Sequence, residues 1–141
     1  MNDEAKCKAS LLELIQHDPN LLRHMSYQPY DVCVYAVKRR GSSIQFVNID
    51  NITSELCFLA VSEDVESLRF INESFHNEEL YLKAVSIDGW VLRFVKKQTP
   101  EICLTALKND WCHSVYRMID IPIEGEFLKE INRMKLLKGP L

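Results

Sequence analysis

The feature that most constrains the fold is an internal repeat of about 24 residues in the middle of the chain. Four short segments share an acidic first position, an aliphatic second position, and an alanine followed by valine or leucine at the end: 31–37, 55–61, 79–85 and 101–107. Their alanines, Ala36, Ala60, Ala84 and Ala106, lie 24, 24 and 22 residues apart. A period of this length predicts a row of small units, each of which buries its apolar face against its neighbours.

A second apolar run follows each segment and completes the repeat. Eight residues after the alanine, the first three copies read Ile-Gln-Phe-Val, Leu-Arg-Phe-Ile and Leu-Arg-Phe-Val, at 44–47, 68–71 and 92–95. The fourth copy keeps a looser version at 116–119, preceded by two additional residues, and 22–25 resembles the second run of a degenerate first copy. The β-branched and aromatic content of this run permits either a short helix or a strand, and we expect a helix.

The first run of each repeat carries the signals of a helix start. Thr53 and Asn77 are N-cap candidates, and Thr99 is followed by Pro100 at the first helical position. An acid in the first turn of each run complements the positive end of the helix dipole. We therefore predict that each 24-residue unit holds two helices of about eight residues, joined by tight polar turns.

Two segments outside the repeats are predicted to be capping helices. Residues 3–17 place leucines and Ile15 in a helical pattern that ends before Pro19, and residues 125–138 place Phe127, Ile131 and Met134 at helical spacing. Terminal helices of this kind cover the apolar ends of a stack of repeats. The predicted fold is all-α, a short α-solenoid of four to five repeats over 22–119 with a capping helix at either end, and 1–141 forms one domain.

The repeat columns resemble a family of short intracellular repeats known as a domain of unknown function, found in bacterial, protist and large-virus proteins. The family pattern has an acid, an aliphatic residue, often Cys, then Leu, Ala and Val, followed by a Leu-x-Phe/Tyr-Val run. The resemblance covers 22–119 and is best over 54–95, with departures at Tyr81 in the Cys column and in the spacing around Cys112. It implies a helical-repeat module with ankyrin-like stacking, and it supplies no reaction and no catalytic residues.

The charge of the chain is concentrated in one segment. The 141 residues carry a net charge of −3, yet residues 48–88 hold nine acids and two bases, a balance of −7. Nucleic-acid binding is disfavoured, because neutralising phosphates requires clustered Lys and Arg. No stretch reaches the roughly 20 apolar residues that span a bilayer, and the acidic N-terminus lacks the layout of a signal peptide. We expect a cytoplasmic protein that makes no membrane contact.

The cysteines and histidines do not predict a catalytic or metal site. Cys33, Cys57 and Cys103 share one repeat column and are predicted to be small buried hydrophobes. Cys112 and His113 are the adjacent thiol–imidazole pair, but neighbours on a helix point apart and no third group is evident. Metal-ligand spacing and phosphate-binding glycine loops are missing from the sequence, so we expect no metal, no cofactor and no enzymatic activity.

These observations favour a scaffold that binds a protein partner, as an inhibitor or adaptor of bacterial or viral origin. The turns within the repeats present charged and aromatic residues, and Trp is enriched at interface hot spots. The predicted partner-binding residues are Arg39, Arg40, Glu63, Asp64, Asp88, Trp90, Asp110 and Trp111. Three alternatives stay open: a nucleic-acid-binding module that uses the scattered bases Lys38, Arg39, Arg40, Lys96 and Lys97, an enzyme that uses Cys112 and His113, and self-association through an exposed repeat edge.

Overall fold

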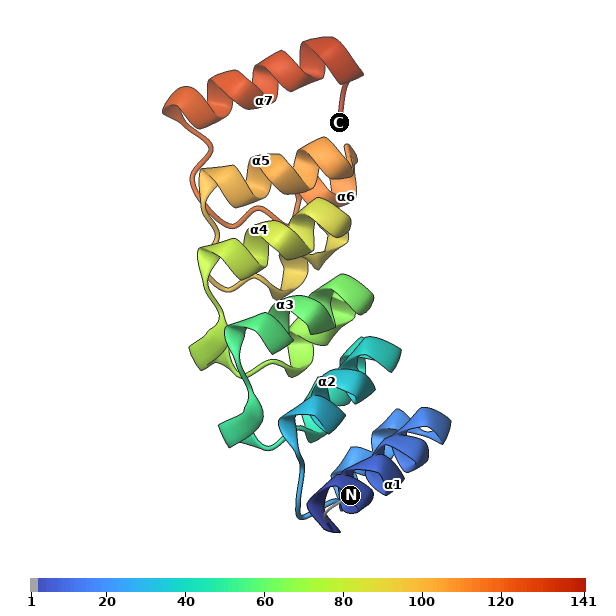
Figure 1. The fold of residues 1–141 in the computed structure, drawn as a ribbon. Helices are drawn as coiled ribbons and strands as arrows, with labels where there is room; N and C mark the ends of the chain where they lie inside the picture. The colour runs from blue at the N-terminus through green and yellow to red at the C-terminus, as the bar shows by residue number, and fades with distance from the viewer. Residues whose placement is uncertain (1–2) are drawn as a thin grey trace. The chain divides into compact units, whose positions relative to one another are not determined.

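The computed structural model of the protein describes residues 3–141 and is all-α, since the residues it describes form helices and no strand (Figure 1). The chain forms two compact units that divide between His76 and Asn77. We call them the N-terminal unit and the C-terminal unit and describe each by itself. The single domain over 1–141 stays a prediction, whereas the all-α class is confirmed.

Each unit alternates α-helices with short 3-10 helices. In the N-terminal unit these are α1 (Asp3–His17), η1 (Pro19–His24), α2 (Tyr30–Arg39), η2 (Gly41–Phe46), η3 (Ile49–Asn51), α3 (Ser54–Glu63), η4 (Val65–Phe70) and η5 (Glu73–Phe75). In the C-terminal unit they are α4 (Glu78–Ile87), η6 (Gly89–Phe94), α5 (Pro100–Asn109), α6 (His113–Tyr116) and α7 (Gly125–Lys138).

The predicted N-caps of the repeat helices are confirmed. The side chains of Thr53, Asn77 and Thr99 each accept a hydrogen bond from the backbone N–H three residues ahead, at 3.1, 2.8 and 3.3 Å. Pro100 takes the first turn of α5, where its missing N–H leaves no helical bond unmade. These caps start α3, α4 and α5, each ten residues long, and substituting such a cap by alanine costs about 1 kcal/mol.

The second run of each repeat is helical, but it is shorter and more tightly wound than predicted. In the first three full copies it is a six-residue 3-10 helix, η2, η4 or η6, instead of a helix of about eight residues. The reason lies at its ends. The residue that ends the α-helix also begins the 3-10 helix in an extended conformation, and the chain is extended again at Val47, Ile71 and Val95. Only two turns fit between these points.

The fourth copy departs from this pattern where the sequence has two additional residues. Cys112, extended at φ −146° and ψ 156°, begins α6, a single α-helical turn over His113–Tyr116. The additional residues thus replace a six-residue 3-10 helix with one α-turn. Its buried side chain is Val115, one residue before the predicted run, whereas the predicted Tyr116 is only half-buried.

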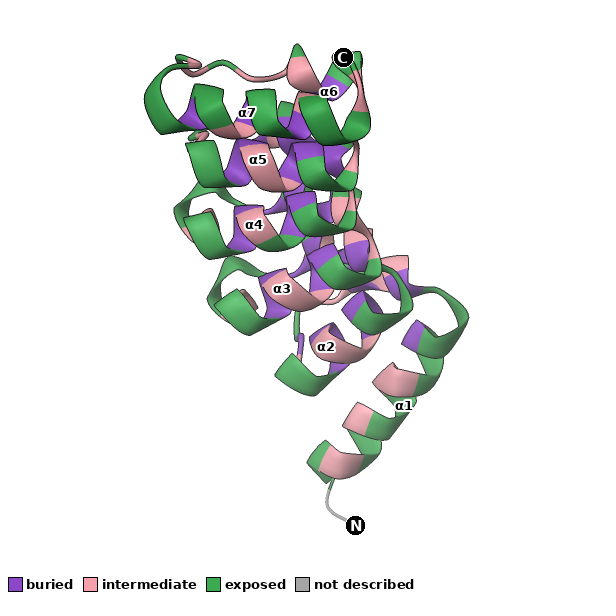
Figure 2. Ribbon diagram, turned by 90° about the horizontal axis from the view of Figure 1, so that it is seen from above, coloured by how far each residue is buried: buried purple, intermediate pink, exposed green. Residues whose placement is uncertain are grey.

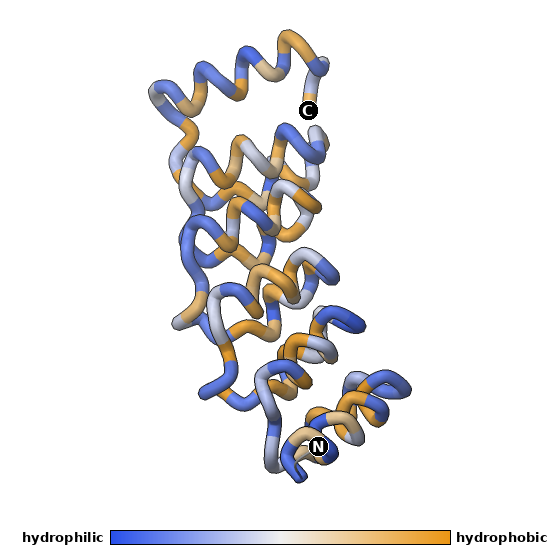
Figure 3. Tube along the Cα trace, viewed as in Figure 1, coloured by the Kyte–Doolittle hydropathy of each residue, from blue (hydrophilic) through white to orange (hydrophobic). Residues whose placement is uncertain are grey.

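Within each unit the repeats pack in two layers, one of α-helices and one of the second runs. In the N-terminal unit α2 contacts α1 and α3, while η2 contacts η1 and η4. In the C-terminal unit α5 contacts α4, α7, η6 and α6. Figure 3 shows apolar stretches recurring along the repeat helices, with polar connections between them. Each second run also packs on the α-helix of its own repeat, so the core of each unit lies between the two layers.

The repeat columns predicted from the sequence form this core (Figure 2). Side chains in these columns are at most 7% exposed, and burying one large aliphatic side chain contributes about 1.5–3 kcal/mol. The α-helical columns are Val32, Leu56, Leu80 and Ile102; Cys33, Cys57, Tyr81 and Cys103; Ala36, Ala60, Ala84 and Ala106; and Val37, Val61, Val85 and Leu107. The buried columns of the second runs are Leu22, Ile44, Leu68 and Leu92, and Val47, Ile71 and Val95, whereas Met25, Tyr116 and Ile119 of the looser predicted copies are only half-buried.

Two glycines allow neighbouring repeats to approach closely. A Cβ atom on Gly41 would lie 2.4 Å from the carbonyl oxygen of Ala60, and one on Gly89 would lie 2.5 Å from that of Ala106. Both distances are shorter than an ordinary van der Waals contact, and the atom that the Cβ would meet belongs to the backbone, which cannot rotate away as a side chain can. The 3-10 helix of one repeat therefore sits directly against the end of the next α-helix within each unit.

The two flanking helices have the predicted bounds, but they bury different amounts of surface. In α7, Phe127, Ile131 and Met134 are buried, as their spacing predicted, and the helix contacts α5. In α1 only Ile15 is fully buried, and Leu14 is 50% exposed, so the predicted apolar stripe is narrower than expected. Leu11 and Leu12 are only half-buried as well, so α1 keeps part of its apolar face exposed.

Candidate functional site

The predicted partner-binding residues cluster where the α-helices meet the second runs. Asp64 ends α3 and begins η4, and its carboxylate accepts the backbone N–H of Glu66 at 3.1 Å. Asp88 does the same between α4 and η6, where it accepts the N–H of Trp90 at 2.8 Å. Both side chains are half-buried, so these acids act first as caps of the 3-10 helices.

Asp110 links two repeats of the C-terminal unit. Its Oδ2 accepts the backbone N–H of Gly89 at 2.7 Å and the side-chain amide of Asn109 at 3.1 Å. The glycine is 21 residues away in the sequence, at the start of the preceding 3-10 helix. The carboxylate is therefore part of the contact between neighbouring repeats, and it holds η6 against the end of α5.

The two tryptophans have different environments. Trp90 is 40% exposed on η6, close to the capping carboxylate of Asp88. Trp111 is half-buried, and its indole Nε1–H donates to the backbone oxygen of Gly139 at 3.2 Å. Trp111 thus fastens the segment after α7 to the end of α5, and Trp90 is the tryptophan with a free aromatic surface.

The charged residues of the N-terminal unit are more exposed. Arg39, Arg40 and Glu63 are all exposed, and Arg39 donates to the backbone oxygen of Gln16 at 3.3 Å. We call the residue that ends an α-helix and begins the second run a junction. The close approach at Gly41 places the junction at Arg40 beside the junction at Asp64, since a Cβ on Gly41 would meet the Asp64 Cβ at 2.9 Å. Within each unit, then, the predicted residues are brought together at adjacent junctions.

A pair of glutamines that the sequence analysis did not single out connects neighbouring repeats. The buried amide of Gln28 donates to the carbonyl oxygens of Leu22 and Phe46, both at 2.9 Å, and accepts the N–H of Asn48 at 2.8 Å. Gln98 repeats this in the C-terminal unit, donating to Met118 O at 2.8 Å and accepting from Asp120 N–H at 3.0 Å. Each glutamine lies five residues before a column cysteine, and this shared offset is the signal that could have found them.

Arginines of the second runs stack on aromatic rings. Arg23 lies over the ring of Phe46 in the next repeat at 4.6 Å, and Arg93 lies over its neighbour Phe94 at 4.6 Å. Such cation–π contacts are worth about 0.5–1 kcal/mol at exposed sites. Arg93 belongs to the Leu-Arg-Phe motif of the repeat, and Arg23 holds the same position in the degenerate first copy, where histidine follows it.

The cysteine column is buried as predicted, and this controls its chemistry. Burial raises the pKa of the Cys57 thiol to about 11. Burial, with a smaller contribution from the charge of Asp120, raises the pKa of Cys103 to about 12. Burial also raises the pKa of Cys33, against a hydrogen bond from Asn51. All three thiols therefore stay protonated at neutral pH and act as packing groups.

The remaining thiols are more accessible. Cys7 is exposed on α1, and Cys112 is half-buried at the start of α6 with His113 exposed beside it. Within residues 3–141, no group of three or more His, Cys, Asp or Glu side chains is placed to hold a metal ion. In the same part of the chain, no helix is both long enough and apolar enough to cross a membrane. The bases of the nucleic-acid alternative, Lys38, Arg39, Arg40, Lys96 and Lys97, are exposed.

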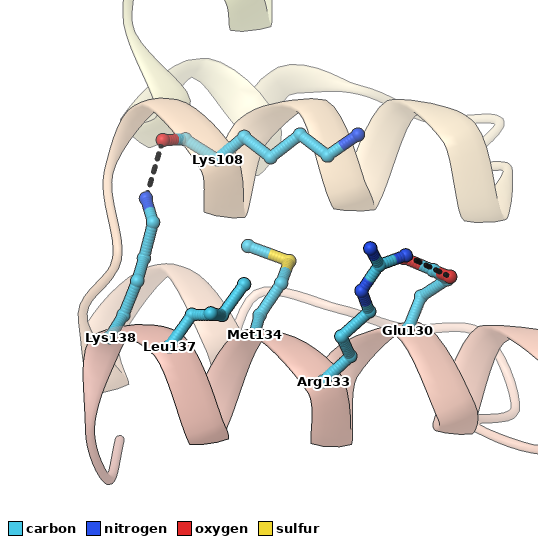
Figure 4. Close-up of a pocket in the computed structure, with 6 residues that line it drawn as sticks. All are labelled: Lys108, Glu130, Arg133, Met134, Leu137 and Lys138. Atoms are coloured by element: carbon cyan, nitrogen blue, oxygen red, sulfur yellow. Dashed lines mark hydrogen bonds and ion pairs between the residues drawn. The ribbon is translucent and has the colours of Figure 1, made fainter.

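Two surface cavities of about 270 Å³ each lie inside single units. One is in the N-terminal unit, between α1 and the segment after η1, and it is lined by Cys7, Leu11, His24, Met25, Ser26 and Tyr27. The other is in the C-terminal unit, between α5 and α7, and it is lined by Lys108, Glu130, Arg133, Met134, Leu137 and Lys138 (Figure 4). The second combines an apolar floor with three cationic side chains, and nothing in the sequence analysis pointed to it.

The comparisons with known proteins add no relative. No family model, curated protein or solved structure matches this chain significantly. The resemblance of the repeat columns to the family of short intracellular repeats stays a prediction.

Proposed function

We propose that this chain is a non-enzymatic helical-repeat protein, a short α-solenoid of four to five repeats, that binds a protein partner. The sequence period runs through 22–119, and in both units the recurring columns are buried. Repeats of this kind keep a fixed core and present changeable side chains outward, which is how solenoids recognise partners.

The observation that carries the proposal is the contrast between the buried columns and the exposed positions beside the ends of the α-helices. The buried columns repeat the same residue types from copy to copy, and the residue that ends each α-helix is aspartate in three of four copies, Asp64, Asp88 and Asp110, with Arg40 in the first. The exposed position just before it changes instead, from Arg39 to Glu63, Ile87 and Asn109. Uniform packing with a changing surface is expected of a scaffold whose surface is specialised for one partner.

The structure separates the predicted binding residues into two groups. Asp64, Asp88 and Asp110 accept backbone hydrogen bonds, and Trp111 bonds the segment after α7. The side chains left to contact a partner directly are the exposed ones: Arg39, Arg40, Glu63 and Trp90. Because interface hot spots are enriched in Trp and Arg, Trp90 and Arg40 are the first candidates.

The test is capture of partners by the full chain from its native source, followed by binding measurements with each purified candidate. Titration calorimetry compares the wild type with Arg40→Glu and Trp90→Ala, and circular dichroism verifies that each variant is folded. We expect at least one specific partner whose affinity falls about tenfold or more in one of these variants. Recovery of nothing above background, together with binding of a small molecule by the folded chain, would overturn the proposal.

A further inference from the structure

The cavity between α5 and α7 has the character of a peptide-docking groove. Its floor is apolar, since Met134 and Leu137 point from α7 into the space below α5 (Figure 4). Leu137 is 78% exposed, so the floor opens to solvent instead of closing into the core. Burial of so exposed an aliphatic side chain by a partner is favourable, because it removes apolar surface from water.

The rim of the cavity is positively charged. Three of the six lining residues are cationic, Lys108, Arg133 and Lys138, and a single acid, Glu130, opposes them. Lys138 donates to the backbone oxygen of Lys108 at 2.9 Å, which fixes its charge at the end of α5. The side chain of Lys108 runs along α5 toward the end of the cavity where Arg133 lies (Figure 4).

The charges at this end are available to a partner. The guanidinium of Arg133 lies 3.7 Å from Glu130 Oε1, and the Arg133 side chain is 72% exposed, so the ion pair is weak and screened by water. Among residues 3–141, no acidic side chain forms an ion pair with Lys108. A carboxylate placed between Lys108 and Arg133 would therefore form charge-assisted contacts with both side chains, and only the weak ion pair between Arg133 and Glu130 would be broken.

We propose that the α5–α7 groove binds an acidic peptide segment of the protein partner, with an aliphatic side chain on Met134 and Leu137 and a carboxylate between Lys108 and Arg133. This rests on the proposed function and specifies the chemistry of the partner. A peptide suits the site because the floor is shallow and open and the cations are spread over two helices, whereas a compact anion would contact only one end.

The test is an unbiased selection. A library of random 12-residue peptides is displayed and selected against the immobilised full chain, and the enriched peptides are synthesised and titrated by fluorescence anisotropy. We expect enrichment of peptides that combine Asp or Glu with Leu or Ile. Their affinity should fall about tenfold or more in the Lys108→Glu/Arg133→Glu double variant and about fivefold or more in Leu137→Ser.

Matched controls come from the same helix. Lys129→Glu reverses a charge that does not line the cavity, and Leu136→Ser removes a leucine that is 88% exposed and outside the lining. Both controls should bind the selected peptides within about twofold of the wild type. Circular dichroism and the urea midpoint of every variant test whether it is folded, and we expect charge reversal on the exposed rim to leave the fold intact.

The outcomes separate this inference from the proposed function. Selected peptides that bind the groove variants as well as the wild type would overturn the groove and leave partner binding standing. Enrichment of basic peptides would also overturn the acidic-peptide groove. So would a chain that binds anionic phospholipid vesicles but none of the peptides. Self-association of the wild type that the groove variants abolish, measured by analytical ultracentrifugation, would assign the groove to a second copy and reject the acidic peptide.

Discussion

The close approach at Gly41 in the N-terminal unit has a counterpart at Gly89 in the C-terminal unit, but the polar groups around the two sites differ. A Cβ would meet a backbone carbonyl at 2.4 Å in one and 2.5 Å in the other. In the C-terminal unit, the N–H of Gly89 is bound by Asp110 at 2.7 Å. In the N-terminal unit, the buried hydroxyl of Ser43, on the same 3-10 helix as Gly41, has no partner among the described residues. Packing is thus common to the two units, whereas the polar contacts are particular to each.

The glutamine contacts, in contrast, recur in both units and differ in how deeply they are buried. Gln28 is 7% exposed and bonds one repeat to the next through backbone groups of Leu22, Phe46 and Asn48. Gln98 is only half-buried and reaches Met118 and Asp120. The geometry recurs across the two units despite the additional residues in the fourth copy, which shows that the amide adapts to a different second run.

The largest expected effect comes from filling the glycine contacts. Gly41→Ala and Gly89→Ala each force a Cβ against backbone that cannot move without displacing a helix, and overpacking of this kind costs about 2–3 kcal/mol. Urea denaturation followed by circular dichroism measures the loss. If the two packing sites are equivalent, the two costs should agree within about 1 kcal/mol.

Gly125→Ala is the matched control for this pair. No atom lies within 4 Å of the position of its Cβ, so the substitution meets open space. Its cost should be about 1–2 kcal/mol and come from the positive φ of 56° alone. A cost for Gly41→Ala no greater than this would contradict the close approach.

The glutamines give the next largest effect and should separate the units. Gln28→Leu leaves the carbonyl oxygen of Phe46 and the N–H of Asn48 without a protein partner, while Leu22 O keeps its bond from the N–H of Met25, and we expect a loss of about 2 kcal/mol. Gln98→Leu should cost about 1–2 kcal/mol, because water can reach its half-buried partners. Hydrogen exchange at the amides of Asn48 and Asp120 reports each loss locally.

The exposed Gln45 supplies the control for the glutamine variants. It bonds only the carbonyl of Ser42 in its own 3-10 helix at 2.9 Å, so Gln45→Leu should change the unfolding free energy by about 0.5 kcal/mol or less. Equal costs for Gln28→Leu and Gln98→Leu would remove the proposed difference between the units.

The buried columns were predictable from the sequence because one residue type recurs at one spacing, as with Ala36 and Ala60, and apolar burial has a periodic signal. The 3-10 winding of the second run was not predictable from the sequence. It depends on how many residues fit between two extended positions, and the apolar pattern does not show this. The α5–α7 groove depends on side chains from two helices that lie far apart in the sequence. Lys108 and Arg133 share no motif, so only the fold brings them together.

The pH dependence of stability tests the cysteine column in both units. A thiol with a raised pKa keeps its proton in the folded protein, while the unfolded chain ionises near the ordinary value of 9.0. The stability from this burial is complete below pH 9 and is lost as pH rises, toward 11 for Cys57 and toward 12 for Cys103. The unfolding free energy should therefore fall more steeply above pH 9 in the wild type than in Cys57→Ala or Cys103→Ala.

The comparison between these two cysteines sharpens the prediction. The raised pKa of Cys57 comes from burial alone, whereas the charge of Asp120 adds to that of Cys103. Asp120→Asn should lower the pKa of Cys103 and leave Cys57 unchanged, which ultraviolet absorbance of the thiolate measures against single-cysteine variants. Parallel slopes of the wild type and both alanine variants above pH 9 would show that the thiols ionise alike in the folded and unfolded chain.

The smallest effect should come from Ser43, and it is expected to be a gain. Its hydroxyl is buried without a partner among residues 3–141, while the same column of the C-terminal unit holds the apolar Val91. Ser43→Ala removes an unsatisfied polar group and only one heavy atom of packing, so stability should rise by about 0.5–1 kcal/mol. Ser54→Ala, on an exposed position of α3, should be neutral within about 0.5 kcal/mol. If Ser43→Ala instead costs 1 kcal/mol or more, its hydroxyl is bound in solution, by water or by a carbonyl, and the difference between Ser43 and Val91 is no longer one of an unsatisfied polar group.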